Sequence, residues 1–235
     1  MKKKTDLNYV RKIAECFLDT DIIETQVPFV AHHPFTSSWT VYIKDDGFKL
    51  VDLHEAEHAA KWRNYYKEEI RNADLLEIFA MLNKPYILNF LKFVANSLSD
   101  EDLGLVLGSF WQSIEVISLD NSITGREIVK WFSRADKNAL MNDNEREIFD
   151  SLPEQITIYR GVTSYNKKKK KAFSWTTNKE IALWFANRFS TGTGEVWTMT
   201  VPKDRILCTF DGREKEVIVN LFSYENADRM LVEKV

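Results

Sequence analysis

The spacing of hydrophobic residues changes at Pro153, and this change limits the possible folds more than any other feature of the 235 residues. From about His54 to Leu152, apolar residues recur every three or four positions, which is the period of an amphipathic helix. After Pro153 come short runs rich in β-branched and aromatic residues, which is typical of strands. These runs are "ITIYRGV", "KAFSWTT", "GEVWTMTVP", "RILCTF", "EVIVN" and "RMLVEKV", and one helical segment, "KEIALWFANRF", interrupts them.

This order predicts an α+β protein with two parts. Residues 1–152 should form a mainly helical N-terminal segment with a short β-hairpin, and residues 153–235 a compact, mostly antiparallel β core. The two parts can also form one integrated domain. Apolar spacing predicts an amphipathic helix over residues 7–18, and Ser99 should cap the clearest later helix. Thr177 and Glu180 predict a capping box at the start of "KEIALWFANRF".

Charge is unevenly divided between the two parts. Residues 1–150 hold 18 Lys and Arg against 25 Asp and Glu, whereas residues 151–235 hold 14 against 10. We therefore expect the C-terminal part to attract an anionic ligand, either a nucleotide or a nucleic acid. Cys16 and Cys208 have no metal-binding spacing and should be free thiols. With no long apolar stretch, we expect a cytoplasmic protein without a membrane partner, although a delivered or secreted toxin would have the same composition.

One motif points to a metal. "HEAEH", His54 to His58, fits the H-E-x-x-H pattern in which two histidines one helical turn apart bind zinc and a glutamate activates water. Against this interpretation, Glu57 is acidic, no histidine follows His58 as a third ligand, and the next helix is polar. A solvated helix start explains the same residues. We expect no metal, and a zinc peptidase stays an alternative.

Two strands of the C-terminal part end in polar residues. Arg160 closes the strand "ITIYRGV" directly before Gly161, where a guanidinium can enter a cleft and grip a phosphate with two hydrogen bonds. In "AFSWTT", Ser174 and Thr176 are two residues apart and should lie on one face of a strand. Each motif alone is short, and each of these residues could equally be an ordinary surface group.

A pair of acids stands before the run Val217 to Val219. In "DGREKEVIVN", Glu214 and Glu216 are two residues apart, so on a strand both side chains would point to the same face. Acids at the start of a strand are commonly just solvated. Here they follow Arg160 and Ser174 along the chain, which gives the pair more weight.

In this order, residues 156–220 resemble the R-S-E class of ADP-ribosyltransferases: Arg, then aromatic-Ser-x-Thr, then Glu-x-Glu before three β-branched residues. Within this class the resemblance is to bacterial toxin-like or phage-related members. The resemblance implies a split, mostly antiparallel β core. It also implies a mono-ADP-ribosyltransferase that takes ADP-ribose from NAD, releases nicotinamide and needs no metal.

The resemblance assigns roles within the NAD site. Arg160 would hold the pyrophosphate or the adenosine ribose, with Gly161 beside it. Ser174 would orient the catalytic glutamate, with Thr176 next to it. Glu216 would bind the ribose hydroxyl adjacent to the bond that breaks, where a fixed carboxylate stabilises the positive charge that develops on the sugar.

The acceptor side is less determined. The resemblance implies that Glu214 engages the acceptor and that Phe210 contacts it, and a glutamate in the first position implies protein arginine as the acceptor class. Five lysines, Lys167 to Lys171, together with Tyr165, leave RNA or DNA as an alternative acceptor. The loop at residues 189–195 would cover the NAD.

Three further possibilities stay open. The chain could be an inactive relative or a non-catalytic nucleic-acid-binding module. The N-terminal segment could bind the target or complete the NAD cleft. An enzyme of this kind could also have an inhibitor, or antitoxin, as a partner.

Overall fold

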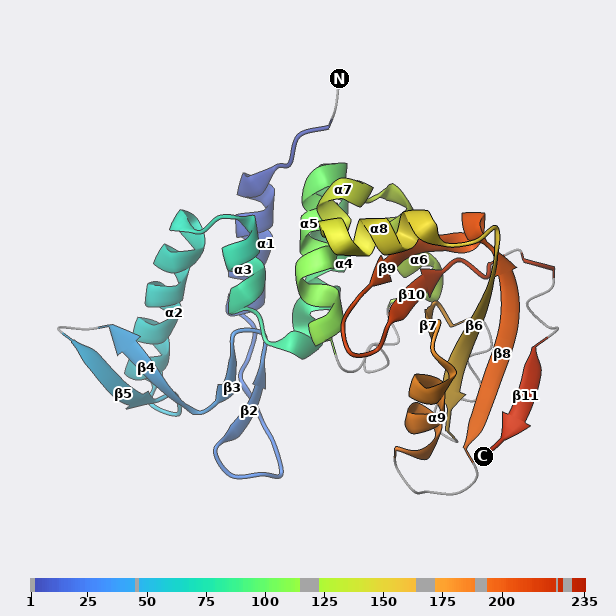
Figure 1. The fold of residues 1–235 in the computed structure, drawn as a ribbon. Coiled ribbons are helices and arrows are strands. Elements are labelled where there is room, and N and C mark those ends of the chain that lie inside the picture. The colour runs from blue at the N-terminus through green and yellow to red at the C-terminus, as the bar shows by residue number, and fades with distance from the viewer. Residues whose placement is uncertain are drawn as a thin grey trace. The chain divides into compact units, whose positions relative to one another are not determined.

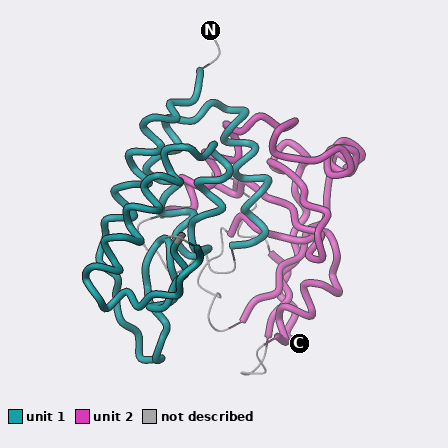
Figure 2. Tube along the Cα trace, turned by 90° about the vertical axis from the view of Figure 1, so that its left-hand side faces the viewer, with its two compact units in different colours: residues 1–123 teal, residues 124–235 magenta. Residues whose placement is uncertain are grey.

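The structure is a computed structural model that describes residues 3–44, 47–114, 123–163, 172–188, 194–222, 224–225 and 230–235. The chain divides into two compact units, residues 1–123 and residues 124–235 (Figure 2). Each unit is described by itself below. Within the described ranges, no helix is both long and apolar enough to cross a bilayer.

The first unit combines helices with small antiparallel sheets (Figure 1). Its helices are α1 (Leu7–Leu18), α2 (Ala56–Asn72), α3 (Leu75–Met81), α4 (Ile87–Val94) and α5 (Asp100–Phe110), with 3-10 turns η1 (Lys84–Tyr86), η2 (Ala95–Ser97) and η3 (Trp111–Ser113). Its strands are β1 (Ile23–Glu24), β2 (Val30–His33) and β3 (Thr36–Ser38) in one sheet, and β4 (Thr40–Lys44) and β5 (Phe48–Asp52) in another.

Two predicted features of this unit are confirmed. Helix α1 covers the segment with the predicted helical spacing and packs against α2, α3 and α4, with Val10, Ala14 and Leu18 fully buried. These three residues are four apart, so they line one face of the helix. Ser99 caps α5, because its hydroxyl accepts a hydrogen bond from the backbone N–H of Asp102 at 3.0 Å.

The second unit places three helices before a six-stranded antiparallel sheet (Figure 1). The helices are α6 (Gly125–Arg134), α7 (Lys137–Leu140), α8 (Asp143–Ser151) and, between two strands, α9 (Lys179–Asn187); η4 (Lys203–Arg205) is a 3-10 turn. The strands are β6 (Gln155–Val162), β7 (Ser174–Thr176), β8 (Glu195–Pro202), β9 (Ile206–Phe210), β10 (Glu216–Val219) and β11 (Leu231–Lys234). Their order across the sheet is β11-β8-β6-β7-β10-β9.

The α+β class with antiparallel sheets is confirmed. The unit begins at residue 124, however, and not at residue 153, where the sequence pattern predicts the start of the β core. The reason is packing, because α6 and α8 both lie against β9. Helices of the expected N-terminal segment thus help to bury the sheet.

The sheet consists of two three-stranded halves that meet at one point. Strands β6 and β8 pair along eight residues, from Gln155 opposite Pro202 to Val162 opposite Glu195. By contrast, β6 and β7 share a single register pair, Tyr159 opposite Thr176. We call the place where β6 and β7 diverge beyond this pair the seam.

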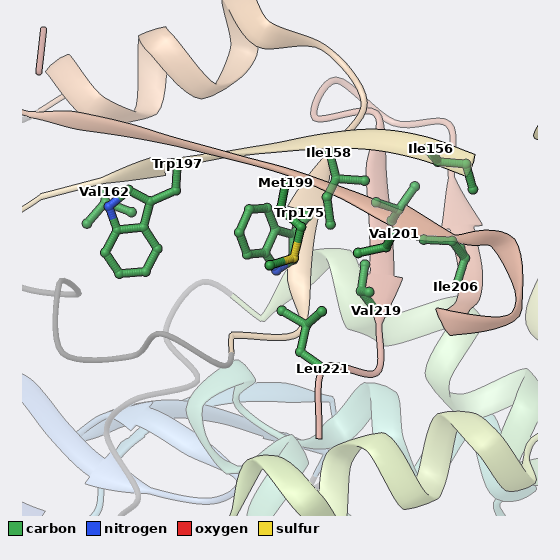
Figure 3. Close-up of a cluster of buried hydrophobic side chains, with 11 residues drawn as sticks. Ile156, Ile158, Val162, Trp175, Trp197, Met199, Val201, Ile206, Val219 and Leu221 are labelled. Carbon is green, nitrogen blue, oxygen red and sulfur yellow. The ribbon is translucent and has the colours of Figure 1, made fainter. Parts of the chain in front are cut away.

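One face of the sheet forms the main core of the unit (Figure 3). Alternate residues of each strand point to this face, as the two-residue period of a strand requires. The buried members are Ile156, Ile158 and Val162 of β6, Trp197, Met199 and Val201 of β8, and Trp175, Ile206, Val217, Val219 and Leu221. Arg160 occupies the next alternate position on β6, between Ile158 and Val162.

Helix α9 packs against β6 so closely that a side chain at Gly161 would not fit. A Cβ there would lie 2.6 Å from Phe185 Cβ and 2.7 Å from the backbone N of Ala186, both closer than real Cβ contacts. The helix begins one residue later than predicted. Asn178 is the cap and accepts from the N–H of Glu180 at 2.8 Å, so the capping box with Thr177 is wrong.

Candidate active site

Arg160 lies at the seam and bridges the two halves of the sheet. If the ladder continued beyond Tyr159 and Thr176, Gly161 would lie opposite Ser174. Instead, Nη1 of Arg160 donates a hydrogen bond to the backbone carbonyl of Ser174. The guanidinium therefore satisfies a carbonyl that a neighbouring strand would otherwise pair.

The guanidinium of Arg160 is enclosed but incompletely satisfied. Its Nε is buried and has no hydrogen-bond partner among the residues that the structure describes. Burial lowers the pKa of Arg160 to about 10, and the charge of Glu216 opposes this shift. Arg160 stays a cation at neutral pH, with one buried donor that has no partner among the described residues.

Glu216 is the first residue of β10 and is buried, with 6% of its surface exposed. It pairs in register with Thr176 on one side and with Phe210 on the other. A carboxylate in such a place needs a compensating charge or hydrogen bonds, and Arg160 supplies positive charge nearby. Arg160, Ser174, Thr176 and Glu216 thus come from three neighbouring strands, β6, β7 and β10. Arg160 bonds to the carbonyl of Ser174, Thr176 lies opposite Glu216, and Glu216 acts electrostatically on Arg160.

Thr176 and Ser174 contribute in different ways. The hydroxyl of Thr176 accepts a hydrogen bond from the N–H of Asn178 at 3.1 Å, and this bond links β7 to the start of α9. Ser174 is half-buried and contacts Arg160 through its carbonyl rather than through its hydroxyl.

Glu214 does not share a strand with Glu216. It lies in the turn before β10, and Lys215 between the two acids has a φ of 44°, in the left-handed region. The prediction that both acids project from one face of a strand is therefore wrong. Glu214 is exposed at the surface, but partial desolvation of its carboxyl raises its pKa, and the charge of Arg188 opposes this shift without reversing it.

The turn that carries Glu214 is held through Asp211. The carboxylate of Asp211 accepts hydrogen bonds from Lys215 Nζ, four residues on, and from Asn144 Nδ2 on α8. Its backbone N–H donates to Glu145 Oε1 at 3.2 Å. These contacts fix both the side chain and the backbone of the turn's first residue.

Glu145 is a buried acid that we did not predict as part of the site. Its second oxygen, Oε2, accepts from the N–H of Asn142 at 2.9 Å and completes the capping box of α8. The capping pattern is visible in the sequence, but the bond to Asp211 is a tertiary contact that no local pattern encodes. Glu145 thus connects α8 to the acid-bearing turn.

Phe210 lies in the core. The residue is 2% exposed, and its ring meets the ring of Phe132 edge-on at a centroid distance of 6.4 Å. An acceptor cannot reach a ring in this position, so the contact implied by the resemblance is not available in this structure. Tyr165, Lys167 to Lys171, and residues 189–193 of the loop lie outside the described residues.

The "HEAEH" motif is not a pair of histidines on one helix. Helix α2 begins at Ala56, and His54 lies before it, stacked on Trp39 at 4.0 Å. Nδ1 of His54 contacts Asp52 Oδ1 at 2.7 Å, and Nδ1 of His58 contacts the carbonyl of Asp52 at 3.1 Å. Among the described residues, no three potential metal ligands gather.

The residues at the seam are the basis for any functional conclusion. A buried cation with an unused donor and a buried carboxylate come from neighbouring strands of one sheet. A further acid, Glu214, is exposed and lies in the turn that precedes β10. No family model, no curated protein and no solved structure matches the chain.

Proposed function

We propose that the protein is an NAD-dependent mono-ADP-ribosyltransferase that transfers ADP-ribose to a macromolecular acceptor and releases nicotinamide. One observation carries this proposal: an arginine with an enclosed, unsatisfied Nε lies near a buried glutamate where an antiparallel sheet divides. A guanidinium with a remaining donor suits a pyrophosphate. A buried carboxylate suits a sugar that becomes positively charged.

The residues present fit NAD on chemical grounds. Arg160 would hold the pyrophosphate or the adenosine ribose, and Gly161 beside it lets α9 pack closely against β6. Ser174 and Thr176 border the same point on β7. The single β6–β7 pair supports the further proposal that the two half-sheets form a split core of the ADP-ribosyltransferase type.

NAD would supply an ADP-ribosyl group attached to a good leaving group. Glu216 would stabilise positive charge on the ribose as the bond to nicotinamide breaks and its electron pair leaves with nicotinamide. The acceptor atom would form the new bond to the same ribose carbon. Glu214 would take the proton that the acceptor loses, because it is an exposed acid on the adjoining turn.

The test is nicotinamide release from NAD by the purified protein and by Glu216→Gln. We expect the variant to lose activity, because the neutral amide cannot stabilise the developing charge. Glu180→Gln, which removes an exposed carboxylate on α9, is the matched control and should retain activity. A folded Glu216→Gln protein with full activity would overturn the assignment.

A further inference from the structure

An exposed aromatic side chain stands in the second half of α9. Trp184 is 58% exposed. Among the described residues of the second unit, no other aromatic residue is exposed. Arg188 follows one helical turn later, and its guanidinium carbon lies 5.3 Å from the centre of the Trp184 ring. We call this pair the Trp184–Arg188 platform.

The platform adjoins the candidate active site. Phe185, between its two members, occupies the space beside Gly161 that a side chain there would need. Its ring meets Trp184 edge-on at 5.0 Å, so the position of the indole is linked to the β6–α9 contact. Arg188 also acts electrostatically on Glu214, the acid that would face the acceptor.

The charge next to Glu214 bears on the acceptor class. The resemblance implies an arginine acceptor, but a guanidinium that approaches Glu214 would meet the like charge of Arg188. An uncharged base attached to a phosphate would meet no such repulsion. An exposed indole provides a stacking surface for a base, and an adjacent arginine can bind a phosphate.

We propose that the Trp184–Arg188 platform binds a base and a neighbouring phosphate of a single-stranded nucleic acid, which is the acceptor of the transferase. This deepens the proposed function and rests on it. A nitrogen of the base would bond to the ribose carbon as the bond to nicotinamide breaks, and the proton from that nitrogen would go to Glu214.

Binding can be measured without NAD, by fluorescence anisotropy of labelled single-stranded RNA and DNA oligonucleotides. Trp184→Ala should weaken binding roughly 5- to 150-fold, the range found for loss of one stacked base, and Trp184→Phe should restore much of it. Arg188→Ala should reduce the slope of log affinity against log salt by about one. Binding that is unchanged in both alanine variants would overturn the proposal.

Lys179→Ala is the matched control for charge. It removes one cation from the other end of the same helix, where Lys179 pairs with Glu233 at 2.7 Å. This variant should bind the oligonucleotides as the wild type does. An equal loss in Lys179→Ala and Arg188→Ala would indicate general attraction to a basic surface and overturn a specific platform.

Two further experiments test whether the platform binds the acceptor or NAD, and whether the acceptor is a nucleic acid or a protein. Saturating NAD should leave oligonucleotide binding intact; displacement would mean that the adenine of NAD occupies the platform, and it would overturn the proposal. In a lysate with labelled NAD, nuclease should remove the label; removal by protease alone would overturn the proposal. If Trp184 supports oligonucleotide binding but the wild type releases no nicotinamide, the platform stands and the transferase assignment fails.

Discussion

At the scale of single residues, Glu216 and Glu214 show how one turn can place two acids in different surroundings. Glu216 is 6% exposed between two strands, whereas Glu214 lies on the exposed turn before β10. The left-handed φ of Lys215 ends the extended chain between them. Because Lys rarely adopts this conformation, the sequence favoured a continuous strand instead.

This difference predicts that the two acids are separable in function. Glu214→Gln should still release nicotinamide from NAD, because Glu216 and Arg160 are untouched, but should lose transfer to the acceptor. The measurement compares nicotinamide release with incorporation of labelled ADP-ribose into lysate macromolecules. If Glu214→Gln and Glu216→Gln lose both activities equally, the division of roles is wrong even where the transferase assignment is right.

His33 is a second residue whose surroundings determine its chemistry. It is 1% exposed, its Nδ1 accepts from the N–H of Phe35 at 3.1 Å, and its Nε2 lies 3.2 Å from the carbonyl of Leu18. The first bond requires Nδ1 to be unprotonated, so the neutral ring donates from Nε2. Burial lowers the pKa of His33 from 6.5 to about 4.

The shift predicts how stability depends on pH. Between pH 6.5 and 4 the unfolded chain binds a proton at His33 that the folded chain does not, so the unfolding free energy falls as the pH falls through this window. The full effect is on the order of 3 kcal/mol. Chemical denaturation at several pH values should show this slope in the wild type and in His32→Gln, whose replaced ring is exposed, but not in His33→Gln. A slope unchanged in His33→Gln would refute the explanation.

At the scale of elements, the contact between β6 and α9 positions both ends of the candidate site. Arg160 precedes Gly161 on the strand, and Phe185 on the helix fills the space at Gly161. A change in the distance between strand and helix would therefore change the position of the Trp184–Arg188 platform relative to Arg160.

Gly161→Ala should be destabilising, by about 1–3 kcal/mol, because the added methyl group overlaps Phe185 and the backbone of α9. The midpoint of denaturant unfolding measures this. Thr157→Ala, on an exposed position of the same strand, is the control and should shift the midpoint little. A Gly161→Ala protein as stable as the wild type would show that the helix moves away at no cost.

The elements also show what the sequence could and could not predict. Helix α1 was predictable because three residues, Val10, Ala14 and Leu18, repeat at the helical period and are all buried. The start of α9 was misplaced by one residue, since Thr177 and Asn178 are both suitable caps and Thr176 decides between them by accepting from Asn178. For the candidate site, the sequence shows the residue types and their order along the chain. It does not show the seam, because the seam depends on how β6 and β7 pair.

At the scale of the whole molecule, the chain divides at residue 124 because α6 and α8 bury their apolar faces against the sheet of the second unit. The apolar period of α6 and α8 is that of any amphipathic helix, and it does not say which partner covers the apolar face. In the structure that partner is β9: Phe132 of α6 packs on Phe210, and Thr209 Oγ1 donates to the carbonyl of Glu145 at 2.7 Å. At Pro153 the spacing of apolar residues changes from helical to strand-like, but the boundary between the two compact units lies earlier, at residue 124.

This packing leads to a prediction about fragments. Residues 124–235 should fold without residues 1–123, because every proposed catalytic residue and the helices that cover β9 lie within this unit. A fragment of residues 153–235 should fail to fold, because it exposes Phe210 and leaves the turn at Asp211 without Glu145. Circular dichroism with thermal unfolding should show a cooperative transition for the longer fragment alone. Cooperative unfolding of the shorter fragment would mean that α6 to α8 are dispensable, and a disordered longer fragment would mean that the second unit needs the first in order to fold.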